Sequence, residues 1–193
     1  MTERQTNQGA PSEPHRLRGL EEVVHGIAWK IKNEVLSPGD VASLRRLDIE
    51  SPDAPAFWKI LVSEVEPHGQ RPGVDGERRW ALILTCIAEL HMLDAKQRTL
   101  GEALAAANVS EMRLARLLRA DLPNLLHTLR PVCRQIASSG ERVDLADLAR
   151  LIISARGNDG TFPAEETAQR LRRRIARDFY LGLHRAAKAM KSA

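Results

Sequence analysis

The sequence predicts an all-α protein of about eight or nine helices. Leu, Ala and Arg dominate its 193 residues, whereas aromatic residues make up only 4%. Glycine and proline cluster between the apolar runs, and no run alternates apolar with polar residues as a strand would. We expect a disordered tail over residues 1–15, a helical bundle over 16–108, and a second bundle over 109–193 that ends in a basic helix.

The first five expected helices lie between the tail and the middle of the chain. They cover residues 17–36, 39–48, 56–65, 78–94 and 99–108. The first is amphipathic, because apolar residues recur every three or four positions from Leu20 to Val35. Pro55 suits the first turn of the third helix. The fourth is the most apolar run and follows a loop over 67–77 that is rich in Gly and Pro, so we expect it at the centre of the core.

The other expected helices follow with shorter connections. They cover residues 111–120, 123–138, 143–155 and 164–190. Ser110 and Asp144 precede two of these runs and are predicted N-caps, since their side-chain oxygens can accept a hydrogen bond from the first turn. The segment 156–163 contains Gly, Asn, Asp and Pro, which favour a loop.

The few aromatic residues lie within apolar runs. Phe57, Trp58, Trp80 and Phe179 are therefore expected in the core. Proteins that stack single-stranded bases need exposed aromatic side chains between positive charges. If this protein binds nucleic acid, we expect it to contact the backbone rather than to read bases.

The last helix carries an excess of positive charge. From Thr161 to Ala193, eight Lys and Arg residues face three Asp and Glu, a surplus of five, while the rest of the chain is close to −1. Its apolar side consists of Leu171, Ile175, Phe179, Gly182, Leu183, Ala186 and Met190, and Arg172 falls near this side. The opposite side holds Arg170, Arg173, Arg174, Arg177, His184, Arg185 and Lys188. Because the helix has few acidic partners four residues away, we interpret this face as a surface for a polyanion; a solvated face is the alternative.

Arginines also gather in the middle of the chain. Arg45 and Arg46 stand next to a turn, and three arginines at intervals of three residues flank the apolar Leu114 and Leu118. The candidate residues of these patches are Arg45, Arg46, Arg113, Arg116, Arg119 and Arg130. Surface ion pairs of little energy are the alternative interpretation of each patch.

Cys86 and Cys133 lie far apart on apolar helical runs, outside any C-x-x-C pair. We expect two buried free thiols in a reducing compartment, with a disulfide as the alternative.

The polar N-terminus lacks the apolar segment of a signal peptide, and the longest apolar run, residues 80–88, is too short to span a membrane. The sequence therefore predicts a cytoplasmic protein.

Sequence motifs of catalysis are absent. The chain contains no phosphate-binding loop, dinucleotide-binding loop or nucleophile elbow, and its six histidines have no partner at metal-ligand spacing. Acidic residues are scattered, whereas a metal-dependent nuclease needs clustered carboxylates. We expect no catalytic residue, no metal site and no cofactor.

Five motifs occur in a particular order along the chain. They are GDVASLRR (39–46), PAFW (55–58), TLGEALA (99–105), SEMRLARLLRAD (110–121) and VDLADLARLI (143–152). In this order and spacing they resemble the CasB family, the small subunit of the type I-E CRISPR surveillance complex Cascade. The resemblance covers roughly residues 20–185.

The resemblance implies an all-helical, non-enzymatic subunit. Two copies would pack head to tail along the backbone subunits that hold the CRISPR RNA, and would bridge the large and head subunits. Arginines would line a groove that holds DNA strands when an R-loop forms. By motif, the resemblance assigns this role to Arg45, Arg46, Arg113, Arg119 and Arg130, and through the basic last helix to Arg170, Arg173, Arg174 and Arg177.

The sequence thus predicts a protein that binds nucleic-acid backbone and helps to assemble a complex. R-loop formation exchanges one duplex for another of similar stability, so modest backbone contacts can shift it. Two other functions stay open: a helical adaptor whose arginines pair with acidic protein surfaces, and a small metal-dependent nuclease.

Overall fold

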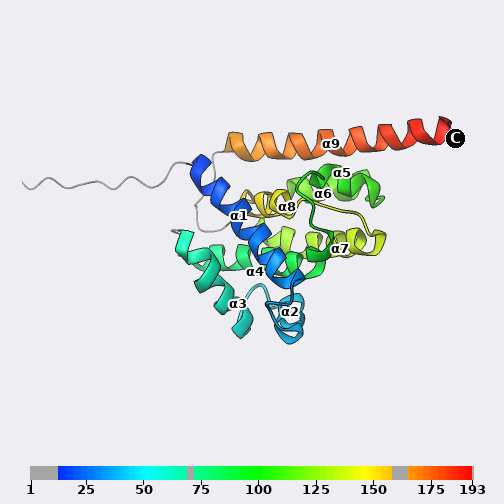
Figure 1. The fold of residues 1–193 in the computed structure, drawn as a ribbon. Coiled ribbons are helices and arrows are strands. Elements are labelled where there is room, and N and C mark those ends of the chain that lie inside the picture. Colours follow the sequence, from blue (N-terminus) through cyan, green and yellow to red (C-terminus); the bar gives the residue numbers. More distant parts are fainter. Residues whose placement is uncertain (1–12, 69–71, 158–164, 193) are drawn as a thin grey trace, which may run out of the picture.

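The computed structural model describes residues 13–68, 72–157 and 165–192, which form nine α-helices and three shorter helical segments (Figure 1). The α-helices are α1 (Glu13–Lys32), α2 (Pro38–Arg45), α3 (Pro55–Ile60), α4 (Val74–Leu90), α5 (Leu100–Ala106), α6 (Glu111–Arg119), α7 (Leu122–Ser139), α8 (Leu145–Ile153) and α9 (Glu165–Ser192). The short segments are the π-helical turn η1 (Leu61–Val65) and the 3₁₀ turns η2 (Glu66–His68) and η3 (His91–Leu93). Within these residues, strand-like pairing is limited to one isolated bridge between Asp94 and Val143. The predicted all-α fold is confirmed.

Helix α4 lies at the centre of the core, as its apolar sequence predicts. Every residue from Trp80 to Ala88 is buried. Helices α1, α2, α7 and α8 all pack against it. A helix that is apolar on all sides must be covered on all sides, because each exposed apolar face would cost free energy.

Helix α1 differs from its predicted range at both ends. It begins at Glu13, inside the predicted tail, of which residues 1–12 lie outside the described part of the chain. It ends at Lys32 because Glu34 adopts a left-handed φ of 58°. The amides of Glu34 and Val35 then donate to the carbonyls of Ile31 and Lys30, a Schellman motif that closes the helix. Val35 is therefore 61% exposed, and its predicted place on the apolar face of the helix is wrong.

The predicted N-caps are confirmed. The Ser110 hydroxyl accepts a hydrogen bond from the Arg113 amide at 3.3 Å, and the Asp144 carboxylate accepts one from Ala146 at 2.8 Å. The predicted loop over 67–77 is shorter, because α4 already begins at Val74. Residues 69–71 of that loop and 158–163 of the next lie outside the described residues.

Three of the four aromatic residues expected in the core are buried there. Phe57 and Phe179 are fully buried and Trp80 nearly so, but Trp58 is 41% exposed, so its prediction is wrong. Helix α3 lies at the edge of the molecule (Figure 1). The ring of Trp58 is nearly perpendicular to that of Phe57, with the ring centroids 5.1 Å apart.

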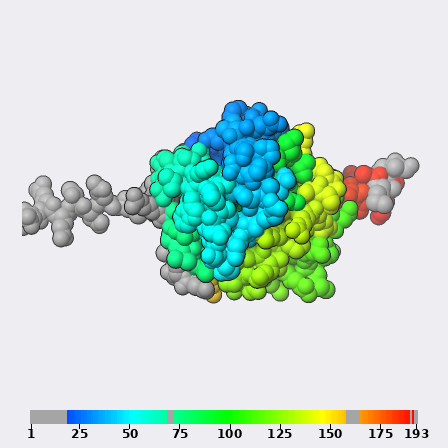
Figure 2. Space-filling view, turned by 90° about the horizontal axis from the view of Figure 1, so that it is seen from below, coloured from blue at the N-terminus to red at the C-terminus, as the bar shows by residue number. Residues whose placement is uncertain are grey.

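Helix α9 lies along one side of the molecule, mainly on α5, and its C-terminal end projects past the body (Figures 1 and 2). Ile175 and Phe179 are buried, as predicted. Ala186, which the periodicity also assigns to the packed side, is exposed, because α9 continues past the elements that would cover it. The side chain of Met190 lies outside the described part of the structure.

No described helix combines the length and apolar character that crossing a membrane requires. The buried apolar residues extend from α1 to α9 and form one cluster. The division into two bundles at residues 108 and 109 stays a prediction.

Candidate nucleic-acid interface

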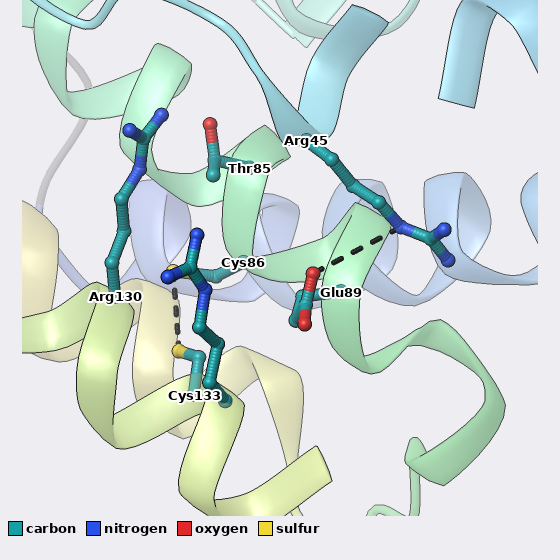
Figure 3. A pocket seen from close by; sticks show the side chains of 7 residues that line it. Arg45, Thr85, Cys86, Glu89, Arg130 and Cys133 are labelled. Carbon is teal, nitrogen blue, oxygen red and sulfur yellow. Dashed lines mark hydrogen bonds and ion pairs between the residues drawn. The ribbon is translucent and has the colours of Figure 1, made fainter. Parts of the chain in front are cut away.

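A shallow pocket lies where α2, α4 and α7 meet (Figure 3). Its lining residues are Arg45, Thr85, Cys86, Glu89, Arg130, Cys133 and Arg134. Arg45 and Arg130, which the sequence predicts as candidates, reach this pocket from different helices and stand on opposite sides of it. The fold therefore brings together two predicted residues that are 85 positions apart in the chain (130 minus 45).

Hydrogen bonds to backbone carbonyls hold both arginines in place. Nε of Arg45 donates to the Ala88 carbonyl at 2.9 Å, and Glu89 lies 3.9 Å away as an ion-pair partner. A guanidinium NH₂ of Arg130 donates to the Leu47 carbonyl at 2.5 Å. Within the described structure, the Arg130 Nε is buried and has no hydrogen-bond partner. The two backbone carbonyls thus fix the positions of both guanidinium groups.

Arg134 is a pocket residue that the sequence analysis missed. It lies one helical turn after Arg130 on α7, and it is exposed. The spacing of four residues between two arginines on one predicted helix is the signal that could have identified it. Arg46, the exposed C-cap of α2, lies beside Arg45, and its side-chain Nε donates to the Ala42 carbonyl at 3.3 Å.

The three arginines of α6 are exposed and lie next to α7. Leu114 and Leu117 anchor the helix in the core, so that Arg113, Arg116 and Arg119 face outward. The Arg113 guanidinium donates to Gln135 of α7, the residue after Arg134. Because of this contact, the predicted α6 patch borders the helix that carries the pocket arginines.

Several arginines of α9 have acidic partners that the sequence did not indicate. Arg170 pairs with Glu166 of its own first turn, and Arg172 lies 3.5 Å from Glu165. Other acids come from elements far away in the sequence: Arg174 lies 2.5 Å from the buried Asp147 of α8, and Arg185 lies 2.9 Å from Glu102 of α5. Among the described residues, Arg170 and Glu166 are thus the one ion pair four residues apart within α9, and acids from other helices compensate Arg174 and Arg185.

Arg173 and Arg177 are the predicted α9 residues that stay exposed without an ion pair in the described part of the structure. They lie on the outer side of α9. The pocket helices α2 and α7 lie on the side of the molecule away from α9, and Figure 2, seen from below Figure 1, shows α2 and α7 and only the far end of α9. The structure thus separates the predicted residues into two surfaces.

The fold also assembles one buried cluster of titratable groups. Nδ1 of His25 lies 2.7 Å from a carboxylate oxygen of Asp94, and its Nε2 lies 3.4 Å from one of Asp144. The carboxylates of Asp144 and Asp94 raise the pKa of His25 to about 9 although burial opposes this. These three groups have a spacing that could hold a metal ion, yet an imidazolium already supplies the positive charge between the two carboxylates. Sequence spacing could not reveal this cluster, because its members come from α1, the end of η3 and the cap of α8.

The two cysteines are free and buried, as predicted. Their sulfurs lie 3.5 Å apart beneath the arginine pocket (Figure 3). Burial and a hydrogen bond are typical of cysteines that pack in the core.

A small helical body with arginines on two surfaces is typical of a binding or assembly protein. Among the described residues, the one cluster of histidine and carboxylates consists of the buried His25 and Asp144 and the partly buried Asp94, and its groups pair with each other. The fold and site define a small all-helical protein with exposed arginines on two of its surfaces.

A comparison with protein families identifies the particular family. Residues 40–180 match the family described as CRISPR-associated protein Cse2, and the chain therefore belongs to that family. It is the family of the small subunit of the CRISPR Cascade complex, which the sequence motifs also indicate. Four of the five motifs lie within the matched range, and the first begins one residue before it. Comparison with curated proteins and with solved structures gave no match.

Proposed function

We propose that this chain is the non-catalytic small subunit of a cytoplasmic type I-E Cascade complex. In this function it binds nucleic-acid backbone without sequence specificity, stabilises the R-loop formed with CRISPR RNA, and supports assembly with the large, backbone and head subunits and a second copy of itself. Membership of the Cse2 family supports the place in the complex. The observation that carries the nucleic-acid role is the convergence of Arg45, Arg130 and Arg134 at one pocket.

The chemistry of the pocket suits phosphate groups. Guanidinium groups are planar, always charged, and donate two parallel hydrogen bonds to phosphate oxygens. Arg45 and Arg130 are fixed by backbone carbonyls, so that binding costs less side-chain entropy than for free surface arginines. None of the residues that line the pocket is aromatic. Such a surface binds backbone and leaves base reading to the pairing of RNA with DNA.

We propose that the main contact with nucleic acid is the surface around the pocket, which carries Arg45 of α2 and Arg130 and Arg134 of α7, rather than helix α9. We call it the α2–α7 surface. Arg170 and Arg174 of α9 are already paired with Glu166 and Asp147, so their charges are partly compensated within the chain. Arg173 and Arg177 are left as a second, weaker candidate surface. The α6 arginines border the α2–α7 surface and extend it.

The decisive experiment compares two matched arginines on the two surfaces. Arg134 and Arg177 are both exposed, and neither forms an ion pair with the described residues, so changing either one should leave the fold intact. The complex is reconstituted with CRISPR RNA and the other subunits, and target-DNA affinity is measured over a series of salt concentrations. Arg134→Gln should weaken binding and reduce the slope of log affinity against log salt by about 0.7 to 0.9, the value for one phosphate. Arg177→Gln should change both quantities less.

Two outcomes would count against this proposal. Equal effects of both variants would show that the two surfaces contribute alike. Normal DNA affinity for Arg134→Gln, and for the triple change of Arg45, Arg130 and Arg134 to Gln in a complex that still assembles, would show that the pocket does not hold nucleic acid. A thermal melt of each variant subunit checks that the lost hydrogen bonds of Arg45 and Arg130 have not unfolded it.

The second candidate function, a protein adaptor without a nucleic-acid role, has its own support. Trp29 and Trp58 are 60% and 41% exposed, and Val62 lies four residues after Trp58 with 56% exposure. Exposed tryptophans are common at protein interfaces. If Trp29→Ser or Trp58→Ser prevents assembly while the arginine variants assemble and bind DNA normally, the adaptor function is supported.

The absence of catalysis is checked by incubating the chain with labelled DNA and RNA in Mg²⁺ or Mn²⁺, where we expect no cleavage.

A further inference from the structure

The two thiols of the chain form a pair between α4 and α7. Cys86 is 1% exposed and Cys133 is 2% exposed, and their sulfurs are 3.5 Å apart although 47 positions separate them in the sequence. The thiol of Cys133 donates to the sulfur of Cys86. A disulfide has a sulfur–sulfur distance of about 2.05 Å, so its formation requires a net approach of only about 1.5 Å. Side-chain rotation and a small shift of the two helices can supply this approach.

The pair lies at the edge of the core, next to a pocket. Both cysteines line this pocket together with Arg45, Arg130 and Arg134, and Figure 3 shows Arg45 and Arg130 beside the two sulfurs. Arg130 and Arg134 flank Cys133 on the same helix, three positions before it and one after it. A small oxidant can therefore approach the sulfurs from the arginine side. The charge of Arg130 lowers the pKa of the Cys86 thiol, but this effect is smaller than the opposing effects of Cys133 and of burial.

We propose that Cys86 and Cys133 are a reversible redox site that forms a disulfide between α4 and α7 on exposure to a hydroperoxide. The thiolate of one cysteine attacks one oxygen of hydrogen peroxide, the O–O bond breaks, and a sulfenic acid and hydroxide form. The hydroxide takes up the proton that the thiol released and becomes water. The sulfur of the other cysteine then attacks the sulfenic sulfur, the S–O bond breaks, and a second water leaves. In sum, two thiols and one hydrogen peroxide give one disulfide and two water molecules.

The closeness of the partner sulfur decides the product. A sulfenic acid at either position has the second sulfur within van der Waals contact, so disulfide formation competes well with further oxidation to a sulfinic acid. The reaction is slow, because the hydrogen bond from Cys133 and burial raise the pKa of the Cys86 thiol well above its usual range. The site thus responds to sustained oxidative conditions rather than to short pulses, and a thiol reductant restores it.

The consequence for the molecule is a covalent link beneath the arginine pocket. The bond closes a long loop of the unfolded chain and so lowers the entropy of the unfolded state. It also fixes α7, which carries Arg130 and Arg134, to α4. The inference does not depend on the proposed function, since it concerns only the sulfurs and their surroundings.

The test uses the full chain, purified in its reduced form. Folded chain is treated with hydrogen peroxide, quenched with an alkylating reagent, and its free thiols are counted after denaturation. We expect the count to fall from two to none, and a Cys86–Cys133 cross-linked peptide to appear after digestion with a mass two hydrogen atoms lower and no oxygen added at the cysteines; oxygen added at the exposed Met92 and Met112 is not counted. The melting temperature should rise by several degrees, and dithiothreitol should reverse all of these changes.

The single variants supply matched controls. Cys86→Ala and Cys133→Ala each leave one thiol without a resolving partner, so peroxide should give sulfenic acid, trapped by dimedone, and then sulfinic acid. If the folded wild type keeps both thiols while the chain in urea forms the disulfide, the native thiols are inert packing groups and the proposal is wrong. Oxygen addition at the cysteines without a cross-link, or a lower melting temperature after cross-linking, would equally overturn it.

Discussion

At the scale of single residues, the contact between α1 and α8 depends on charges that are taken out of water. His25 lies between Asp94 and Asp144 and is 8% exposed. Arg150 extends this network, since it bonds Asp147 at 2.8 Å and Glu21 of α1 at 2.7 Å. Buried charges are stable only when they are paired, and the removal of one partner is costly because it leaves the other uncompensated.

His25 should make the stability of the chain depend on pH. Its pKa is raised from 6.5 to about 9 in the folded chain, so its contribution is complete below pH 6.5 and is lost as the pH rises through 9. We expect the difference in unfolding free energy between wild type and His25→Gln to shrink by on the order of 3 kcal/mol from about pH 6 to about pH 9.5. Urea unfolding across this range measures it. A constant difference would show that His25 is neutral in the fold, and His127→Gln on the exposed side of α7 is the control.

Asp144 changes stability at the acidic end of the pH range. Burial opposes its ionisation, but His25 and the Ala146 amide lower its pKa below the ordinary 3.8. Its contribution is therefore present above pH 3.8 and is lost as the pH falls through the lower value in the folded chain. Together the two groups should make this contact most stable between about pH 4 and about pH 6.5.

Arg174 gives a second test at this scale. Asp147 is 3% exposed and is paired with Arg150 and Arg174, the second of which comes from α9. Arg174→Gln should destabilise the chain by about 1–2 kcal/mol, because the buried carboxylate loses one of two cationic partners. Arg173→Gln, one residue earlier and exposed, should change the unfolding free energy by less than about 0.5 kcal/mol. Equal effects in urea titrations would show that the pair with Asp147 does not stabilise the fold.

At the scale of helices, α5 and α9 approach each other so closely that only small residues fit between them. A Cβ added to Gly101 would lie 2.3 Å from the Ile175 carbonyl oxygen and 2.8 Å from the Phe179 amide nitrogen. One added to Gly182 would lie 2.8 Å from Cβ of Ala105. Since the obstacles at Gly101 include backbone atoms, the helices would have to move apart to admit even a methyl group.

Gly101→Ala should therefore destabilise the chain although alanine favours helices. We expect a loss of about 1–3 kcal/mol in urea unfolding, from the strain of separating α5 and α9. Gly26→Ala is the matched control, because it lies inside α1 with no heavy atom within 4 Å of the added Cβ, and should stabilise by about 0.5–1 kcal/mol. A neutral or stabilising Gly101→Ala would show that α9 does not pack this closely in solution.

At the scale of the whole molecule, α9 has two parts with different surroundings. It packs on α5 and α8 as far as Gly182 and Leu183, whereas residues 184–189 are exposed and the end projects past the body (Figure 1). Deletion of residues 187–193 should change the unfolding free energy by less than about 0.5 kcal/mol, because residues 187–189 and 191 are exposed. A loss of more than about 1 kcal/mol would show that the end packs on the body. The same deletion in the reconstituted complex shows whether this projecting end contributes to assembly.

Much of the fold and part of the candidate site could be predicted from the sequence. The periodicity of apolar residues located the helices, and the oxygens of Ser110 and Asp144 located two helix starts. The prediction missed the end of α1, because the Schellman turn forms at Glu34 and not at a glycine. It also assigned Trp58 to the core, since an apolar run does not show which side of its helix faces the edge of the molecule.

The sequence by itself determined the helical class, the family and the arginines that can meet an anion, because these depend on local periodicity, motifs and residue type. Only the tertiary structure decided which arginines are available. Asp147 and Glu102, distant in the chain, compensate Arg174 and Arg185, while Arg45, Arg130 and Arg134 converge on one pocket. Likewise His25 and its two aspartates, and the sulfurs of Cys86 and Cys133, meet only after folding. Ion pairs, hydrogen bonds and sulfur contacts act over a few ångströms in space, and sequence separation does not determine such distances.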